Sequence, residues 1–278
     1  MKYDPIKSSL GNFFNRTIFL RRAFYRMLDL LLLRAWHVHA ELGRFLSEHK
    51  KENNLVVLDA GSGFGQYSWY LAKKRPLWKV SGIEIKPEQV EDCNQFFERA
   101  GVANASFELA DLTKFRKPSH FHLILSIDVM EHIQEDVTVF ENFYASLKPG
   151  GRLLISTPSD QGGSGVDHAH DHSFIEEHVR DGYGKKEIEE KLNKGGFEKV
   201  DVKYTYGTPG KISWLFSMKY PIQMLGVSKW FFLLLPFYYL VVFPFCLLLN
   251  YADVKMPHKT GTGLLVSATK IKKNPKNS

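Results

Sequence analysis

The sequence predicts an α/β fold built around a largely parallel sheet, and three observations support this prediction. From Leu55 onward, short apolar runs alternate with helical stretches, which is the pattern of βαβ units. A glycine-rich turn follows the first apolar run, and acidic residues follow the next ones. The composition, with 44% hydrophobic and 24% charged residues in 278, indicates a folded chain that can bury a large core.

The basic charge is concentrated at the two ends of the chain. The formal net charge is +7, and residues 1–50 contain nine Lys or Arg against four Asp or Glu. Residues 251–278 contain six against one, whereas the middle is mildly acidic, with 22 against 25. Such ends favour an anionic membrane surface as a partner. The two cysteines, Cys93 and Cys246, form no disulfide framework or zinc motif, which favours a reduced, cytosol-facing protein.

The first 50 residues are expected to contain one long amphipathic helix from about Arg16 to His49. Apolar residues recur there at helical spacing, with arginines on another face. These arginines interrupt the apolar stretch, so the segment does not read as a secretory signal. Two interpretations stay open: the helix packs on its own domain, or it lies on lipid.

The remaining elements follow from the alternation of apolar runs, turns and helical patterns. Pro87 suits the first turn of a helix, and Gly195-Gly196 suits the end of another. We expect strands near 55–59, 79–84, 105–109, 121–127, 152–157, 197–206 and 263–270, and helices near 65–75, 87–99, 136–147 and 184–194.

The first expected strand runs into a tight glycine turn. Asp59 is followed by Ala60-Gly61-Ser62-Gly63-Phe64-Gly65, and glycine allows positive φ and close approach of a ligand to the backbone. Glu84 ends the second strand, and Asp111-Leu112 follows the third. An acid at the end of the second strand can accept ribose hydroxyls, and one after the third can receive an exocyclic amine.

In these motifs the sequence resembles the class I S-adenosylmethionine-dependent methyltransferases over about Leu55–Tyr206 plus the last strand. The matching segments are V-L-D-A-G-S-G-F-G, G-I-E-I, A-D-L, D-V-M-E-H-I and L-K-P-G-G-R-L-L-I. The resemblance implies a Rossmann-like seven-stranded sheet with an antiparallel last strand. It also implies a cofactor, S-adenosyl-L-methionine. Its contacts would be Asp59, Gly61, Ser62, Gly63 and Gly65 for the methionine part, Glu84 and Ile85 for the ribose, Asp111 and Leu112 for the adenine, and Asp128 and Val129 on the other side.

His132 is the candidate catalytic base. It follows the fourth strand, at the sheet edge where ligands bind in such folds, and methyl transfer to a protonated acceptor needs a base there. The alternative is a histidine bonded to backbone at the start of a helix. Some relatives bind a divalent metal in a similar segment, so Glu131, His132 and a loop histidine are an alternative metal set, although we assign none.

A second polar cluster lies between the fifth strand and the next helix, where acceptor-binding elements are inserted in this fold. It supplies five candidate acceptor-binding residues, and a solvated polar loop is the alternative. The candidates are His168, His172, His178, Arg180 and Tyr183. The Asn/Asp-Pro-Pro-aromatic signature of adenine N6-methylating enzymes is absent, so we expect no nucleic-acid partner.

Trp230 to Leu249 is an uncharged apolar stretch long enough to cross a membrane. A single crossing would place the flanking strands on opposite sides, although both must join one sheet. Pro236 and Pro244 are also expected to break a straight helix. The sequence therefore predicts a broken helical hairpin that dips into one leaflet or lies on it, with an apolar lid or dimer contact as the alternative.

The sequence predicts four regions: an N-terminal helix over 1–50, a methyltransferase core over 51–206, an apolar insertion over 207–257, and the last strand with a basic tail over 258–278. We expect a monotopic or peripheral protein on the cytoplasmic face of the membrane. It would methylate a lipophilic acceptor, most naturally on oxygen, as in the quinone-biosynthesis O-methyltransferases that it resembles. The alternatives are a fatty-acid cyclopropane synthase, a soluble small-molecule methyltransferase, and a membrane scaffold that binds cofactor without transfer.

Overall fold

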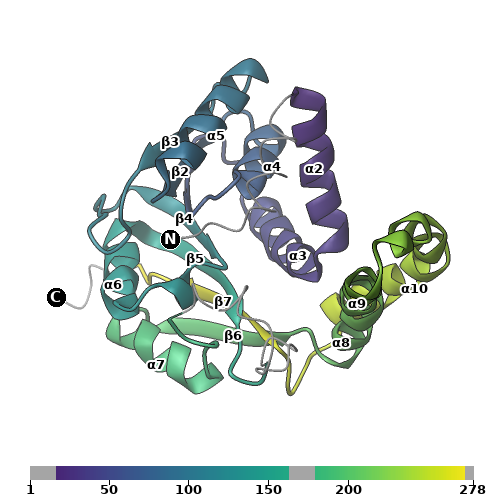
Figure 1. Cartoon of the computed structure of the whole chain (residues 1–278). Coiled ribbons are helices and arrows are strands. Elements are labelled where there is room, and N and C mark those ends of the chain that lie inside the picture. Colours follow the sequence, from purple (N-terminus) through teal and green to yellow (C-terminus); the bar gives the residue numbers. More distant parts are fainter. Residues whose placement is uncertain (1–16, 163–178, 273–278) are drawn as a thin grey trace.

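A seven-stranded sheet forms the centre of the computed structural model, which describes residues 17–162 and 179–272. The strand order is β3-β2-β1-β4-β5-β7-β6 (Figure 1). Only β7 runs antiparallel to its neighbours, β5 and β6, which confirms the predicted fold. The strands are β1 Val56–Ala60, β2 Lys79–Glu84, β3 Ala105–Leu109, β4 Phe121–Ile127, β5 Leu147–Pro158, β6 Lys199–Thr205 and β7 Gly263–Thr269.

Helices cover both faces of the sheet and divide the core into two layers (Figure 1). On one face, α6 and α7 pack Phe140, Phe143 and Leu192 against the central strands. On the other, α3, α4 and α5 contribute Leu42, Leu71 and other buried side chains. The bounds of these helices are α3 Leu33–Glu48, α4 Gln66–Lys74, α5 Pro87–Arg99, α6 Asp136–Ser146 and α7 Lys185–Lys194.

The expected single N-terminal helix is wrong, because the chain forms two helices, α2 Ile18–Leu31 and α3. Leu32 between them is extended, with φ −90° and ψ 112°. Both helices reach the same core layer, α2 through Tyr25 and α3 through Val38, and the Tyr25 hydroxyl also donates to the Phe64 carbonyl in the glycine turn.

Residues 208–255 form a helical hairpin that stands apart from the sheet (Figure 1). Its first arm is α8 Thr208–Trp214, a π-helical turn η2 Leu215–Lys219, and α9 Tyr220–Val227; a 3₁₀ turn η3 Lys229–Leu233 leads to the second arm, α10 Leu235–Lys255. The prediction that prolines break a straight helix over Trp230–Leu249 holds at Pro236, before which the chain passes from η3 to α10, and is wrong at Pro244. Pro236 lies in the first turn of α10, where its missing N–H has no helical partner to lose, and α10 continues through Pro244.

The hairpin leaves the sheet at the edge formed by the carboxyl ends of the parallel strands. It connects the end of β6, which is parallel to β5, to the start of β7. Asp253 in α10 is fully buried and fixes the base of the hairpin. Its carboxylate accepts hydrogen bonds from the backbone N–H groups of Tyr206 (3.1 Å) and Gly210 (2.8 Å) and pairs with His37 of α3 (2.8 Å).

Candidate functional site

The glycine turn between β1 and α4 leaves room beside the backbone. Gly61, Gly63 and Gly65 have φ values of 75°, 51° and 76°. A Cβ added at Gly61 would lie 2.4 Å from a methyl carbon of Val129, so this position has space only for hydrogen. A Cβ at Gly63 would meet no atom within 4 Å, so its surroundings are open. The turn thus presents an open, closely approachable backbone at the carboxyl edge of the sheet.

Asp59, at the end of β1, is buried under this turn. One oxygen of its carboxylate accepts hydrogen bonds from the Ser68 hydroxyl (2.6 Å) and the Ser68 backbone N–H (3.1 Å). Burial raises the pKa of Asp59 to about 6, although the two hydrogen bonds from Ser68 oppose this shift. The carboxylate therefore ties β1 to α4. Its raised pKa means that its protonation state can change with the charge of a group bound beside the turn.

Glu84, at the end of β2, holds the glycine turn from the other side. Its carboxylate accepts from the backbone N–H of Gly63 (3.0 Å), and from those of Ile85 (2.9 Å) and Lys86 (3.3 Å). These bonds use three of the roughly four acceptor positions of a carboxylate. Contact with both ribose hydroxyls would require Glu84 to share or exchange some of them, and this role stays a prediction.

The predicted adenine-side residues follow β3. The Asp111 carboxylate accepts from the Thr113 hydroxyl (2.7 Å) and backbone N–H (2.9 Å), and these bonds hold its pKa below the usual value. Leu112 is buried in the core, whereas Ile85, beyond β2, is 64% exposed. The structure therefore places the predicted cofactor residues after three adjacent strands, at one edge of the sheet.

Asp128, directly after β4, has a backbone φ of 54° and pairs with Arg34. Arg34 is the second residue of α3, and its backbone N–H donates to the Tyr206 hydroxyl (3.1 Å). Sequence reasoning missed Arg34, because it treated the N-terminal helix as one continuous amphipathic element. The break at Leu32 is what directs the start of α3 toward the end of β4.

His132 ends a short 3₁₀ helix, η1 Met130–His132, and its side chain is exposed at the carboxyl edge of the sheet. Its neighbour Glu131 is buried, accepts from the Thr157 hydroxyl (3.1 Å), and has a pKa raised chiefly by burial. Within 17–162 and 179–272, no group of three His, Cys, Asp or Glu side chains is placed to hold a metal ion. His168, His172 and His178 lie outside the described residues.

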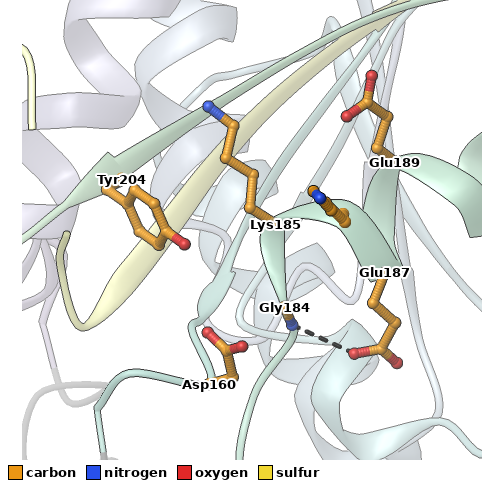
Figure 2. A pocket seen from close by; sticks show the side chains of 7 residues that line it. Asp160, Gly184, Lys185, Glu187, Glu189 and Tyr204 are labelled. Carbon is orange, nitrogen blue, oxygen red and sulfur yellow. Dashed lines mark hydrogen bonds between the residues drawn. The ribbon is translucent and has the colours of Figure 1, made fainter. Parts of the chain in front are cut away.

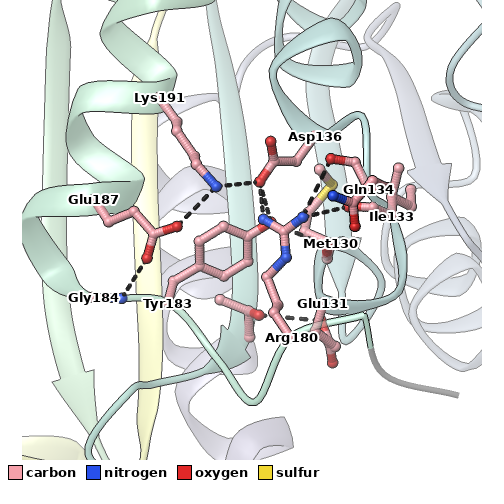
Figure 3. A network of polar contacts seen from close by, with 11 residues as sticks. Met130, Glu131, Ile133, Gln134, Asp136, Arg180, Tyr183, Gly184, Glu187 and Lys191 are labelled. Carbon is pink, nitrogen blue, oxygen red and sulfur yellow. Dashed lines mark hydrogen bonds and ion pairs between the residues drawn. The ribbon is translucent and has the colours of Figure 1, made fainter. Parts of the chain in front are cut away.

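Arg180 and Tyr183 join a polar network under the loop that precedes α7 (Figure 3). Tyr183 is fully buried and donates to Asp136 (2.8 Å) and to the Met130 carbonyl (3.0 Å). Arg180 pairs with Asp136 and donates to the Ile133 carbonyl (2.7 Å). Both side chains thus bond within the protein and brace the segment that carries His132; their direct contact with an acceptor stays a prediction.

Asp136 is the centre of this network. Burial alone would raise its pKa, but hydrogen bonds from Lys191 (2.8 Å) and Tyr183, together with the Arg180 charge, hold the pKa below its usual value.

A separate hollow of about 500 Å³ lies beside the start of α7 (Figure 2). It is lined by Asp160, Tyr204 and residues 184–187 and 189, and includes none of the predicted site residues.

The residues around the glycine turn fit S-adenosyl-L-methionine, the cofactor that the resemblance implies. The open space at Gly63 can take a ligand, and the buried Ser62 hydroxyl has no hydrogen-bond partner within the described protein. Asp59 is suited to a cationic ligand, because a nearby positive charge favours its ionised form. The methionine part would lie along Asp59 and the turn, the ribose toward Glu84, and the adenine toward Asp111 and Leu112.

Comparison with known proteins agrees with this geometry. Residues 51–201 match the family model described as a methyltransferase domain. Phosphoethanolamine N-methyltransferase 1 of Arabidopsis thaliana is 38% identical over 103 residues, which cover 36% of this chain and 20% of that protein. The ubiquinone biosynthesis O-methyltransferase of Coxiella burnetii is 28% identical over 102 residues, which cover 36% of this chain and 42% of that protein.

Among solved structures, phosphoethanolamine N-methyltransferase 2 of Haemonchus contortus in complex with S-adenosyl-L-methionine has a TM-score of 0.60 at 18% identity. The likeness covers 95% of this chain and 60% of that chain, and at this identity it shows the fold alone. The chain spans about a fifth of the length of the plant relatives that it matches. Arg34 and the helical hairpin both lie outside the segment matched by the family model.

Proposed function

Because this chain belongs to the methyltransferase-domain family and is a class I S-adenosylmethionine-dependent methyltransferase, we propose that it methylates a lipophilic acceptor at a membrane surface, on an oxygen atom. The observation that carries the proposal is the exposed apolar hairpin, which is attached at the sheet edge that holds the glycine turn. The relatives named above include both N- and O-methylating enzymes, so the acceptor is argued from this chain's own residues.

Methyl transfer mainly requires positioning. Bound S-adenosyl-L-methionine supplies an electrophilic methyl group on a sulfonium sulfur. Asp59 and the glycine turn orient the cofactor, and the acceptor oxygen approaches from the side of Asp128 and His132. His132, which is exposed at this edge, would take the proton of the acceptor hydroxyl as the oxygen–carbon bond forms and the methyl–sulfur bond of the cofactor breaks.

The pairing of Asp128 with Arg34 supports oxygen over nitrogen as the methylated atom. A protonated amine would be held best by a carboxylate whose charge is not already neutralised. Here the Arg34 guanidinium pairs with Asp128 after the end of β4, so this carboxylate is poorly suited to hold a protonated amine. The proposed acceptor atom is therefore the oxygen of a hydroxyl, such as that of a phenol.

One face of α10 supports the membrane location. Phe237, Leu240, Val241, Phe245 and Leu248, here called the α10 stripe, are each between 51% and 76% exposed. The helix is long and apolar enough to cross a membrane by length and composition, and only 11% of its most apolar window is buried. The core helix of a soluble domain would be mostly buried, so this surface is suited to lipid.

Two tyrosines of α10 satisfy backbone carbonyls in the first arm of the hairpin, as contact with lipid favours. The π-helical turn in the first arm leaves backbone carbonyls without regular helical partners. The Tyr238 hydroxyl donates to the Phe216 carbonyl, and the Tyr239 hydroxyl to the Ser217 carbonyl, each at 2.7 Å. Both ends of the hairpin return to the same sheet, so it would enter one leaflet from the cytoplasmic face rather than cross the bilayer.

Vesicle flotation tests the membrane contact. We expect the full chain to float with vesicles of phosphatidylcholine and phosphatidylglycerol. A stripe variant, with Phe237, Leu240, Val241 and Leu248 changed to Ser, should lose most of this binding. The matched control changes Leu77 and Leu109 to Ser, since these exposed apolar residues lie far from the hairpin in sequence. Equal flotation of the stripe variant and the control would remove the hairpin as the anchor.

Labelling tests the acceptor. The purified protein is incubated with methyl-labelled S-adenosyl-L-methionine and either a lipid extract or a soluble extract of its source cells. Label in the lipid phase that is lost in Asp59→Ala, and that mass spectrometry of the labelled product places on an oxygen atom, supports the proposal. Label in the aqueous phase alone would refute the lipophilic acceptor and leave the hairpin as a lid or a dimer contact.

A further inference from the structure

One face of α2 carries apolar and basic side chains that point away from the core. Four residues share this face, because they recur at spacings of three and four along the helix; they are Phe19, Arg22, Arg26 and Leu30. Phe19 is 77% exposed and Leu30 44%, and both arginines are exposed as well. We infer that these four residues, here called the α2 outer face, lie on the head groups of an anionic membrane and form a second lipid contact beside the hairpin.

The inner face of α2 sets the rotation of the helix on the protein. Arg21 and Tyr25 are buried, and the side chains of both donate to the Phe64 carbonyl of the glycine turn. Asp29, the only acidic residue of α2, shares a hydrogen bond with His39 of α3 (2.7 Å). The outer face therefore carries two cations and no carboxylate, and it can meet a partner while the inner face stays in place.

α3 connects α2 to the hairpin. Its His39 bonds to Asp29 of α2, and its His37 bonds to the buried Asp253 at the base of the hairpin (2.8 Å). Figure 1 shows α3 between α2 and the hairpin, on one side of the molecule. The α2 outer face and the α10 stripe are thus attached to the same helix, which suits two parts of one membrane contact.

The chemistry of the outer face fits anionic lipid. A helix that lies in the plane of a membrane places large apolar side chains below the head groups and basic side chains among them. Phe19 and Leu30 lie toward the two ends of the face, with Arg22 and Arg26 between them. Two apolar side chains alone bury little area, so the arginines, each contributing about fivefold in affinity for an anionic surface, make the contact selective for anionic lipid. This inference deepens the proposed function and rests on its membrane location.

A charge variant tests the outer face without changing the inner one. The arginine variant combines Arg22→Gln with Arg26→Gln. The matched control changes Lys194 and Lys199 to Gln, because these exposed lysines of α7 and β6 remove the same charge from another part of the protein. Since all four side chains are exposed, the thermal unfolding midpoints of both proteins should stay close to that of the native chain.

Flotation measures the affinity of these proteins for vesicles. With phosphatidylcholine and phosphatidylglycerol in about 50 mM salt, where screening is weak, we expect the native chain to bind. The arginine variant should bind about thirtyfold more weakly, and the control should stay within about threefold of the native chain. On phosphatidylcholine alone, the arginine variant and the native chain should bind equally.

A fluorescent probe shows whether α2 itself meets the lipid. An environment-sensitive dye is attached at Leu30→Cys, since Cys93 and Cys246 are both buried. The comparison position is Lys199→Cys, which is exposed at the start of β6. Addition of the anionic vesicles should shift the emission of the dye at position 30 to the blue and leave that at position 199 unchanged.

The inference is overturned if the arginine variant binds anionic vesicles within about threefold of its control, or if the dye at position 30 does not respond to them. Equal binding would leave an acidic protein as the partner that suits the two arginines. Failure of the proposed function gives a different result: the stripe variant then floats as its own control does, or label enters only the aqueous phase. Both results can occur while the arginine variant still loses its binding to anionic vesicles, so the two failures are distinguishable.

Discussion

At the residue scale, Asp59 is the clearest source of pH dependence. Its pKa rises from 3.8 to about 6 on folding because the side chain is buried. A carboxyl whose pKa is higher in the folded state favours folding when protonated, so this stability is present below about pH 4 and is lost as pH rises toward 6. The shift corresponds to about 3 kcal/mol of unfolding free energy, as an order of magnitude.

We therefore expect Asp59→Asn to become relatively more stable than the native chain as pH rises. Urea unfolding at about pH 4 and about pH 7, without cofactor, should show the difference between the two proteins changing by about 3 kcal/mol in favour of the variant. The same substitution at Asp201, which is exposed, is the control. A difference that is constant across this range would mean that Asp59 titrates normally in the folded protein.

Gly61 gives a second prediction at this scale. Its positive φ, together with the Val129 methyl carbon that would lie 2.4 Å from an added Cβ, opposes any side chain. Gly61→Ala should lower the unfolding free energy by about 1–3 kcal/mol and weaken binding of S-adenosylhomocysteine, since the turn must shift. Adding Val129→Ala should restore part of the stability, because it removes the steric part but not the backbone strain. If Val129→Ala restores no stability to Gly61→Ala, the whole loss of unfolding free energy comes from backbone strain at position 61.

The site residues that the sequence predicted are those that a strand end positions. Asp59, Glu84 and Asp111 follow short apolar runs, and parallel strands bring their carboxyl ends to one edge. Arg34 could not be found in this way, since its place depends on a tertiary contact between Tyr206 and the start of α3. The sequence could not reveal the hydrogen bonds of Arg180 and Tyr183 within the protein either. A cluster of polar residues in a sequence does not show whether the side chains face a ligand or one another.

At the scale of elements, a buried arginine joins α2 to the glycine turn, beside the core contacts of Tyr25. Arg21 is 1% exposed and donates to Asp92 (2.7 Å), the Phe64 carbonyl (2.9 Å) and the Tyr25 hydroxyl (2.9 Å). Phe64 belongs to the glycine turn, so α2 and the turn are joined through this side chain. Loss of one partner of a buried charged network is strongly destabilising.

Arg21→Met should therefore lower the unfolding free energy by about 3 kcal/mol and increase hydrogen exchange along α2. Arg22→Met is the control, because Arg22 is exposed. Its guanidinium makes a cation–π contact with Trp69, 6.0 Å from the ring centroid, in place of a buried charged network. We expect the control to change stability by less than about 1 kcal/mol. Slow exchange in α2 of Arg21→Met would show that apolar packing alone holds the helix.

Helices were predicted well where local pattern and tertiary packing agree, as in α5, whose bounds Pro87–Arg99 match the expected 87–99. The sequence did not predict the break at Leu32 or the continuation of α10 through Pro244. No proline or glycine stops a helix at Leu32; the chain bends there, and Tyr25 of α2 and Val38 of α3 both reach the same core layer. In α10, Pro244 was taken as a helix breaker, although a single proline can be accommodated in a helix whose carbonyls find other partners.

At the scale of the whole molecule, apolar and basic surfaces have different sources. The apolar surface belongs to the hairpin, whereas the positive charge lies in residues 1–50 and 251–278, which flank the mildly acidic middle. If both contact the membrane, binding should separate into two parts: a hydrophobic part that is insensitive to salt, and an electrostatic part that needs anionic lipid and is screened by salt.

Flotation with two kinds of vesicle at two salt concentrations measures these parts separately. The native chain should bind phosphatidylcholine vesicles equally in about 50 mM and about 500 mM salt, a range over which screening changes strongly. With phosphatidylglycerol added, binding should increase at low salt and return to the neutral-vesicle value at high salt. The stripe variant should keep only the salt-sensitive part, because its charges are unchanged. If that variant bound neutral vesicles as well as the native chain does, the hydrophobic part would come from outside α10, and the exposed apolar residues of α2 would be the next to change.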